Sequence, residues 1–150
     1  MAIVMTGAWG STDGISKWSI PDDLYRIKKI YIAAGSEDCV HSIMFSYEDI
    51  NGRLQTTNKF GGDGGEQYTI TIGDNEEITR ISGTFGEHDN VTVITSLAFG
   101  TNQGDYGPFG KTVGTNFSLG VIKGKFFGFY GTYGNYVESF GATINPPPYN

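Results

Sequence analysis

Few side chains in this sequence could carry out chemistry, and they lie far apart along the chain. The two histidines are His41 and His88, the single cysteine is Cys39, and the isolated carboxylates include Asp13 and Glu138. A glycosidase needs two carboxyl groups that face each other across a cleft, one of them with a raised pKa. Nothing in the sequence predicts that Asp13 or Glu138 is buried in this way. A zinc site needs about four ligands, and no further Cys or His joins Cys39 and His41. We therefore predict no enzyme, no metal site and no cofactor.

A glycine-rich loop at residues 61–65 and the charge balance both bear on anionic ligands. Glycine-rich loops hold phosphates when a Lys-Ser or Lys-Thr pair follows and a helix begins there, and neither feature follows this loop. The chain has 10 basic and 16 acidic residues, a net charge of −6, with no block of like charge. A phosphate backbone would be repelled, so we predict no nucleic-acid partner.

The elements that must position these residues are short strands joined by tight turns. The composition of 23 glycines, 9 tyrosines and 10 phenylalanines in 150 residues is typical of such a fold. Asn51-Gly52 predicts a type I′ hairpin turn. The prolines at positions 146–148 cannot join a sheet, so we expect one domain over residues 1–145 and a Pro-rich tail over 146–150. Runs of alternating or β-branched apolar residues predict strands at 24–33, 40–47, 68–72, 78–83, 91–99, 117–122, 126–130 and 136–144.

An internal repeat of about 50 residues organises these strands. An aromatic residue followed by Gly-x-x-x-Gly begins at Trp9, Phe60 and Phe109. A serine within an apolar strand marks the same place in each copy, at Ser42, Ser96 and Ser139. One sheet alone could not bury its apolar face, so three copies of about four strands each imply three sheets in threefold pseudosymmetry around a shared core.

Several glycine- and aromatic-rich motifs follow one another in order along the chain. They are Gly7-Ala8-Trp9-Gly10, Ile81-Ser82-Gly83-Thr84-Phe85-Gly86, Tyr106-Gly107-Pro108-Phe109-Gly110, Phe127-Gly128-Phe129-Tyr130-Gly131 and Gly134-Asn135-Tyr136-Val137-Glu138-Ser139-Phe140-Gly141. Together they resemble the jacalin-related lectins over residues 7–144. The resemblance implies an all-β fold, the β-prism with three four-stranded antiparallel sheets. It also implies reversible binding of mannose- or glucose-type glycans, as in the cytoplasmic plant members of that family.

The resemblance also implies a site, in which sugar lies between the first glycine-rich loop and a C-terminal loop. The first loop would contribute the backbone amide of Gly14. The second loop begins at Gly134 and would contribute the amides of Asn135 and Tyr136. The carboxylate of Glu138 would accept charge-assisted hydrogen bonds from two neighbouring hydroxyls.

Two features depart from the family pattern, and three residues are expected at the rim of the site. Position 138 is glutamate where the family has aspartate, which carries the carboxylate one methylene further from the backbone. The first loop is less rich in glycine and adds a carboxylate at Asp13. We expect Asp13, His88 and Tyr133 at the rim, where Tyr133 or Tyr136 could cover the apolar face of a sugar.

The repeat also predicts how many sites the chain has. The position equivalent to Glu138 is His41 in the first copy and Thr95 in the second, and neither side chain can replace a carboxylate that accepts from two hydroxyls. We therefore expect one sugar site per chain. A homodimer would then provide several weak sites at once.

The first residues, the hydropathy and the cysteine count bear on location. The first residues lack a basic region and a long apolar run, and no apolar stretch approaches a membrane span. A single cysteine excludes an intramolecular disulfide. We expect a cytoplasmic or nucleocytoplasmic protein without membrane insertion.

The alternative to a sugar-binding function is a protein-interaction or structural module that has weakened or lost sugar binding through the change at Glu138.

Overall fold

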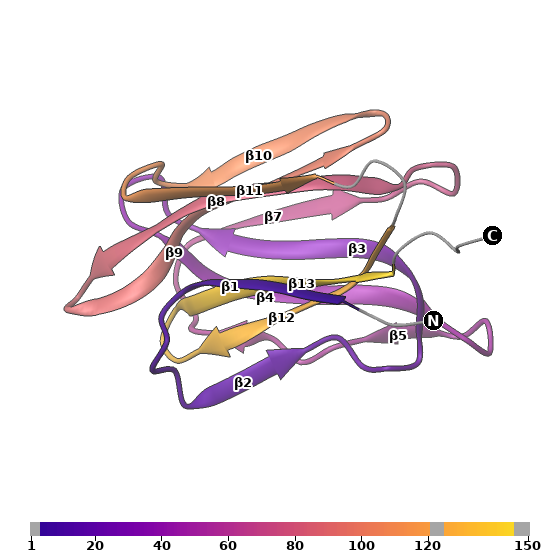
Figure 1. The fold of residues 1–150 in the computed structure, drawn as a ribbon, viewed down its shortest axis with the longest axis horizontal. Helices are drawn as coiled ribbons and strands as arrows, with labels where there is room; N and C mark the ends of the chain where they lie inside the picture. The colour runs from indigo at the N-terminus through magenta and orange to yellow at the C-terminus, as the bar shows by residue number, and fades with distance from the viewer. Residues whose placement is uncertain (1–3, 121–124, 146–150) are drawn as a thin grey trace.

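The fold consists of three antiparallel sheets that enclose one core (Figure 1). The computed structural model describes residues 4–120 and 125–145, and within these ranges every regular secondary-structure element is a β-strand. The first sheet has the strand order β1 (Val4–Gly10), β13 (Val137–Asn145), β12 (Lys125–Tyr133) and β2 (Ser16–Ser19). The second has the order β5 (Leu54–Thr56), β4 (Val40–Asp49), β3 (Leu24–Ala34) and β7 (Glu66–Thr71), with β6 (Phe60–Gly61) also paired to β4. The third has the order β10 (Gly104–Gly110), β9 (Val91–Thr101), β8 (Ile78–His88) and β11 (Thr115–Gly120).

This arrangement confirms the predicted all-β prism. The second sheet differs in one detail, because its outer strand is broken into β5 and β6, which both pair with β4. The sheet therefore still has four strand positions. The Pro-rich tail at 146–150 lies outside the described residues.

The repeat seen in the sequence is a repeat in strand register. In each sheet the glycine that follows the repeated aromatic residue pairs with the marker serine of an inner strand. Gly10 pairs with Ser139, Gly61 with Ser42 and Gly110 with Ser96. The three glycine-rich loops consequently begin at equivalent places, at one end of the prism.

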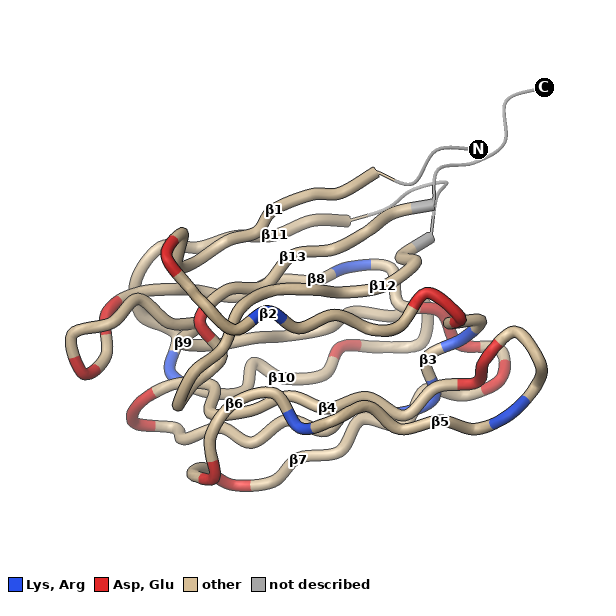
Figure 2. The backbone as a smooth tube through the Cα atoms, turned by 90° about the horizontal axis from the view of Figure 1, so that it is seen from below, with Lys and Arg blue, Asp and Glu red and all other residues tan. Residues whose placement is uncertain are grey.

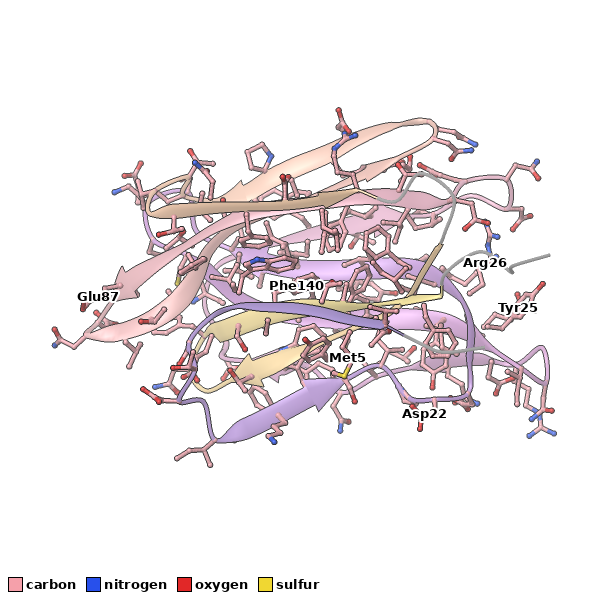
Figure 3. The ribbon with its side chains drawn as sticks, in the orientation of Figure 1. Met5, Asp22, Tyr25, Arg26, Glu87 and Phe140 are labelled. Atoms are coloured by element: carbon pink, nitrogen blue, oxygen red, sulfur yellow. The ribbon has the colours of Figure 1, made fainter. Side chains whose placement is uncertain are left out.

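Aromatic side chains from all three sheets fill the space between them. Phe140 of β13 is fully buried and points into the interior in Figure 3. Its ring centroid lies 5.2 Å from that of Phe129, 6.1 Å from that of Phe99 and 5.6 Å from that of Trp18. Trp18 is 3% exposed and stacks on Phe45 of the second sheet with ring centroids 5.9 Å apart, so it is a core residue. Such contacts bury apolar area that no single sheet could bury alone.

The tightest hairpin turn is not the one predicted from the sequence. Gly52 has a positive φ of 80°, but Asn51 does not share it, so the connection from β4 to β5 is not a type I′ turn. Two consecutive positive φ values occur instead at Asp89 (52°) and Asn90 (64°), between β8 and β9. Asparagine and aspartate tolerate this conformation better than most residues, which explains a two-residue turn without glycine.

Charged residues lie mainly in the turns at the two ends of the prism (Figure 2). The middles of the strands are apolar on their inner face. Among residues 4–120 and 125–145 no helix could cross a membrane.

Candidate carbohydrate-binding site

The first loop of the site, residues 11–15, connects β1 to β2 at one end of the prism (Figure 1). The Ser11 N–H donates to the carbonyl oxygen of Glu138, with a nitrogen-to-oxygen distance of 2.9 Å. Gly14 lies so close to Thr132 of β12 that a Cβ atom at position 14 would collide with the Thr132 side chain. The loop is therefore fixed over the two strands that carry the second loop.

The second loop, residues 134–136, joins β12 to β13. The Gly134 N–H donates to the carbonyl oxygen of Tyr136 at 2.9 Å, which closes a tight turn. Gly134 and Asn135 are exposed and Tyr136 is half-buried. The carbonyl of Asn135 packs directly on Gly62, where a Cβ atom would collide with it. The loop thus lies between the first glycine-rich loop and the glycine-rich loop of the second sheet.

The Glu138 carboxylate lies beside this second loop and is free to accept hydrogen bonds. One of its oxygens would be 2.7 Å from a Cβ atom at Gly134, so the carboxylate packs against the loop. The residue is half-buried, and this burial raises the pKa of its carboxyl group. Within the described residues no hydrogen bond or ion pair engages the carboxylate. A partly desolvated acceptor without a protein partner is suited to accept from a ligand.

The equivalent positions in the other two copies are already occupied by protein contacts. Glycine approaches the strand carbonyl at His41 and at Thr95 in the way that Gly10 approaches it at Glu138. The His41 Nε2 lies 2.9 Å from the Asp38 carboxylate. The Thr95 hydroxyl donates to the carbonyl of Val113 at 2.7 Å. Among the residues that the structure describes, the three equivalent positions thus include one free carboxylate, at Glu138.

The structure brings most of the predicted site residues together at one end of the first sheet. Gly14, Gly134 and Glu138 converge at one end of the first sheet, and Asn135 contributes exposed backbone there. Asp13 is exposed in the first loop. The Tyr133 ring packs on Phe60 with ring centroids 5.7 Å apart, so it is turned towards the second sheet. His88 contacts the second loop through Tyr136, with ring centroids 5.1 Å apart.

The side chain of Tyr136 is directed towards the β8–β9 hairpin. Its hydroxyl donates to Asp89 Oδ2 at 2.6 Å, and this hydrogen bond is the main cause that raises the pKa of Tyr136 to about 12. The ring also has edge contacts with His41 and His88. Sequence reasoning missed Asp89 and Thr132. The pair Asp89-Asn90, read as a turn signal, would have indicated a hairpin tip here.

Asp38, Cys39 and His41 form a small cluster next to Tyr136, in which one ligand atom from each lies within 4.8 Å of the others. Asp38 accepts from the Cys39 N–H at 2.6 Å and lies 2.9 Å from His41. Cys39 is fully buried, and burial is the main cause that raises its thiol pKa to about 12. The Asp38 carboxylate therefore pairs with two groups of its own segment, the Cys39 N–H and the His41 ring.

Three antiparallel sheets around one core, with repeated glycine loops meeting inner strands at one end, define the β-prism class of lectin. Residues 6–143 match the family described as the Jacalin-like lectin domain. A mannose/glucose-specific lectin from Parkia pendula is 38% identical over 151 residues, which cover 95% of this chain. The chain spans about a third of that relative's length (32%).

Two solved structures extend the comparison. A mannose-binding jacalin-related lectin from Ananas comosus has a TM-score of 0.87 at 32% identity, covering 96% of this chain and 98% of that one. A mannose-specific jacalin-related lectin from Morus nigra, solved in complex with mannose, has a TM-score of 0.86 at 30% identity, covering 97% and 96%. The chain belongs to the jacalin-like lectin domain family. This confirms the predicted family, the jacalin-related lectins.

Proposed function

We propose that this domain binds mannose- or glucose-type glycans, reversibly and without covalent chemistry, at one shallow site per chain. The site consists of the backbone amides of Gly14, Asn135 and Tyr136 and the carboxylate of Glu138. The observation that carries the proposal is the Glu138 carboxylate, which is half-buried, packs against Gly134 and has no partner among the described residues. Mannose-binding relatives support the same ligand class.

The geometry suits a pyranose with adjacent free hydroxyls. An ionised carboxylate accepts from two neighbouring hydroxyls, while backbone N–H groups donate to the ring oxygen and to other hydroxyl oxygens. The extra methylene of Glu138 is accommodated because the side chain folds back over Gly134, which has no side chain. These groups favour sugar binding over an interaction module that has lost its site.

The expected affinity is low, which bears on assembly. A single monosaccharide in a shallow site binds with a dissociation constant of about 1 mM. We propose that the chain forms a homodimer, so that two sites act together on a branched glycan. We also propose a cytoplasmic or nucleocytoplasmic location, with which the free, buried thiol of Cys39 is compatible.

Calorimetric titration with methyl α-mannoside in the presence of EDTA tests the proposal. We expect saturable binding that is unchanged by EDTA, because the four proposed contacts involve no metal ion. Methyl α-galactoside, in which the 2- and 4-hydroxyls both have the opposite orientation, serves as the comparison sugar and should bind more weakly. Failure to bind any mannoside or glucoside would overturn the proposal.

A further inference from the structure

The Tyr136 side chain is held by groups from both of the other sheets. Asp89, at the tip of the β8–β9 hairpin, accepts a hydrogen bond from the Tyr136 hydroxyl at 2.6 Å. The His88 ring meets the Tyr136 ring edge-on at a centroid distance of 5.1 Å and an interplanar angle of 83°. The His41 ring, from β4, meets it at 5.2 Å and 68°. Tyr136 therefore links the second loop of the site to the rest of the prism.

The hairpin that carries Asp89 is well suited to hold a neighbouring loop. Its strands pair without a break from Phe85 and Ile94 to His88 and Val91, so the two-residue turn at Asp89 and Asn90 closes directly on the ladder. Such short turns leave the tip little freedom relative to its strands. A short hydrogen bond to a carboxylate is among the stronger polar contacts in proteins.

The side chains of the loop offer few other anchors. Gly134 has no side chain and Asn135 is exposed, while Asn135 and Tyr136 are the residues whose amides are proposed to bind sugar. His41, which packs on Tyr136, is itself fixed by Asp38 at 2.9 Å. Besides the contact of the Asn135 carbonyl with Gly62, the Tyr136 side chain is therefore the main anchor of the loop.

We infer that Asp89 is a positioning residue for sugar binding: through the Tyr136 hydroxyl, it holds residues 134–136 in the conformation that presents their amides next to Glu138. This inference rests on the proposed function. A loop that is ordered before binding loses less entropy when the ligand binds, so the hydrogen bond raises affinity although Asp89 itself touches no sugar.

A double-mutant cycle on methyl α-mannoside binding, measured by calorimetry, tests the inference. Asp89→Gly removes the carboxylate at a position where a φ of 52° suits glycine, and Tyr136→Phe removes only the hydroxyl. We expect each variant to bind about three- to tenfold more weakly, as loss of one hydrogen bond predicts. The double variant should bind no more weakly than either single variant, because both remove the same contact. Asp89→Asn, which keeps an oxygen that accepts from the hydroxyl, should retain most of the affinity.

The matched control is Glu87→Ala on the same hairpin. Glu87 is exposed near the tip of the hairpin (Figure 3) and makes no contact with Tyr136, so its removal takes away one negative charge and leaves the Tyr136 contact intact. Its affinity should equal that of the parent, and melting temperatures should show that all variants fold. If the parent fails to bind, the proposed function is wrong. If the parent binds and Asp89→Gly binds equally well, or if the two losses are additive, the positioning role is wrong while the proposed function stands.

Discussion

Glu138 has an unusual combination of properties for a carboxylate at the end of a sheet. Burial raises its pKa, yet no described residue pairs with it. A raised pKa means that the folded state holds the proton more tightly than the unfolded state, so above this pKa the ionised group lowers stability. Titratable groups with shifted pKa values are concentrated at binding and catalytic sites, which is consistent with a ligand-binding role for Glu138. Substitutions at this position should therefore affect binding and not folding.

The first prediction concerns variants of this residue. Glu138→Ala should lose about 2–4 kcal/mol of binding free energy, the usual range for a group accepting two charge-assisted hydrogen bonds, which removes measurable affinity for mannose. Glu138→Gln should be nearly as damaging, because its amide nitrogen donates where the ligand also donates. Glu138→Asp restores the residue typical of the family and should bind. Titration of all three, with thermal melts as the folding control, checks this. Mannose binding by Glu138→Ala equal to that of the parent would show that the carboxylate is not a ligand.

The second prediction is the pH dependence of binding. Only the ionised carboxylate accepts from two hydroxyls, and burial places its pKa above the value of 4.5 that is usual for glutamate. Mannose affinity should therefore begin to fall, as the pH decreases, at a higher pH than an ordinary glutamate would give. Titrations between pH 7 and the onset of acid unfolding measure this. Constant affinity down to the lowest pH at which the domain stays folded would contradict it.

At the scale of elements, the glycine that ends β1 and its counterpart that ends β10 make the same close approach to an inner strand. Gly10 has a φ of 113° and Gly110 a φ of 104°, and a Cβ atom at either would collide with a strand carbonyl, at Glu138 or at Thr95 respectively. Both positions thus require glycine for two reasons, backbone conformation and space.

The third prediction uses this pair as matched variants. Gly10→Ala and Gly110→Ala should each destabilise the domain by about 2–4 kcal/mol, since strain in φ and overpacking both contribute. Only Gly10→Ala should weaken mannose binding, because the strand that it displaces carries Glu138. Urea unfolding and sugar titration of both variants decide the matter. An equal loss of affinity in Gly110→Ala would show that the effect reflects general destabilisation.

At this scale the sequence predicts the sheets but not every turn. The three aromatic-glycine pairs and the three marker serines predicted the sheets, because a repeat fixes register in all copies at once. Asn51-Gly52 does not form the predicted type I′ turn, because it lies in a longer loop that begins after Glu48 and ends at Leu54. In this loop the Asp49 carboxylate accepts from the N–H groups of Asn51 and Arg53, contacts that the dipeptide alone does not predict. The role of Asp89 could not be predicted, because its partner Tyr136 lies 47 residues away along the chain and on another sheet.

At the scale of the whole molecule, one core joins all three sheets and the only cysteine is a buried free thiol. Side chains such as Phe140 and Trp18 contact residues from more than one sheet, so no sheet keeps its interior surface buried when another unfolds. The site also depends on all three sheets, since its second loop contacts both neighbouring sheets.

The fourth prediction is therefore a single cooperative unfolding transition that does not depend on reducing agent. Circular dichroism should show a β-sheet spectrum, and far-ultraviolet and tyrosine or tryptophan signals should report the same midpoint with and without dithiothreitol. Separate transitions for the two probes would contradict a shared core, and a lower midpoint on reduction would contradict the assignment of Cys39 as a free thiol.

The most direct measurement of the central claim is a titration of the isotope-labelled domain with methyl α-mannoside, followed by backbone amide NMR. The account predicts that the amide signals of Gly14, Asn135 and Tyr136 shift most and saturate with one dissociation constant of about 1 mM, while the amides of the equivalent loops near His41 and Thr95 shift less. Shifts that centre on either of those loops, or no saturable shift at Gly14 and Asn135, would contradict it.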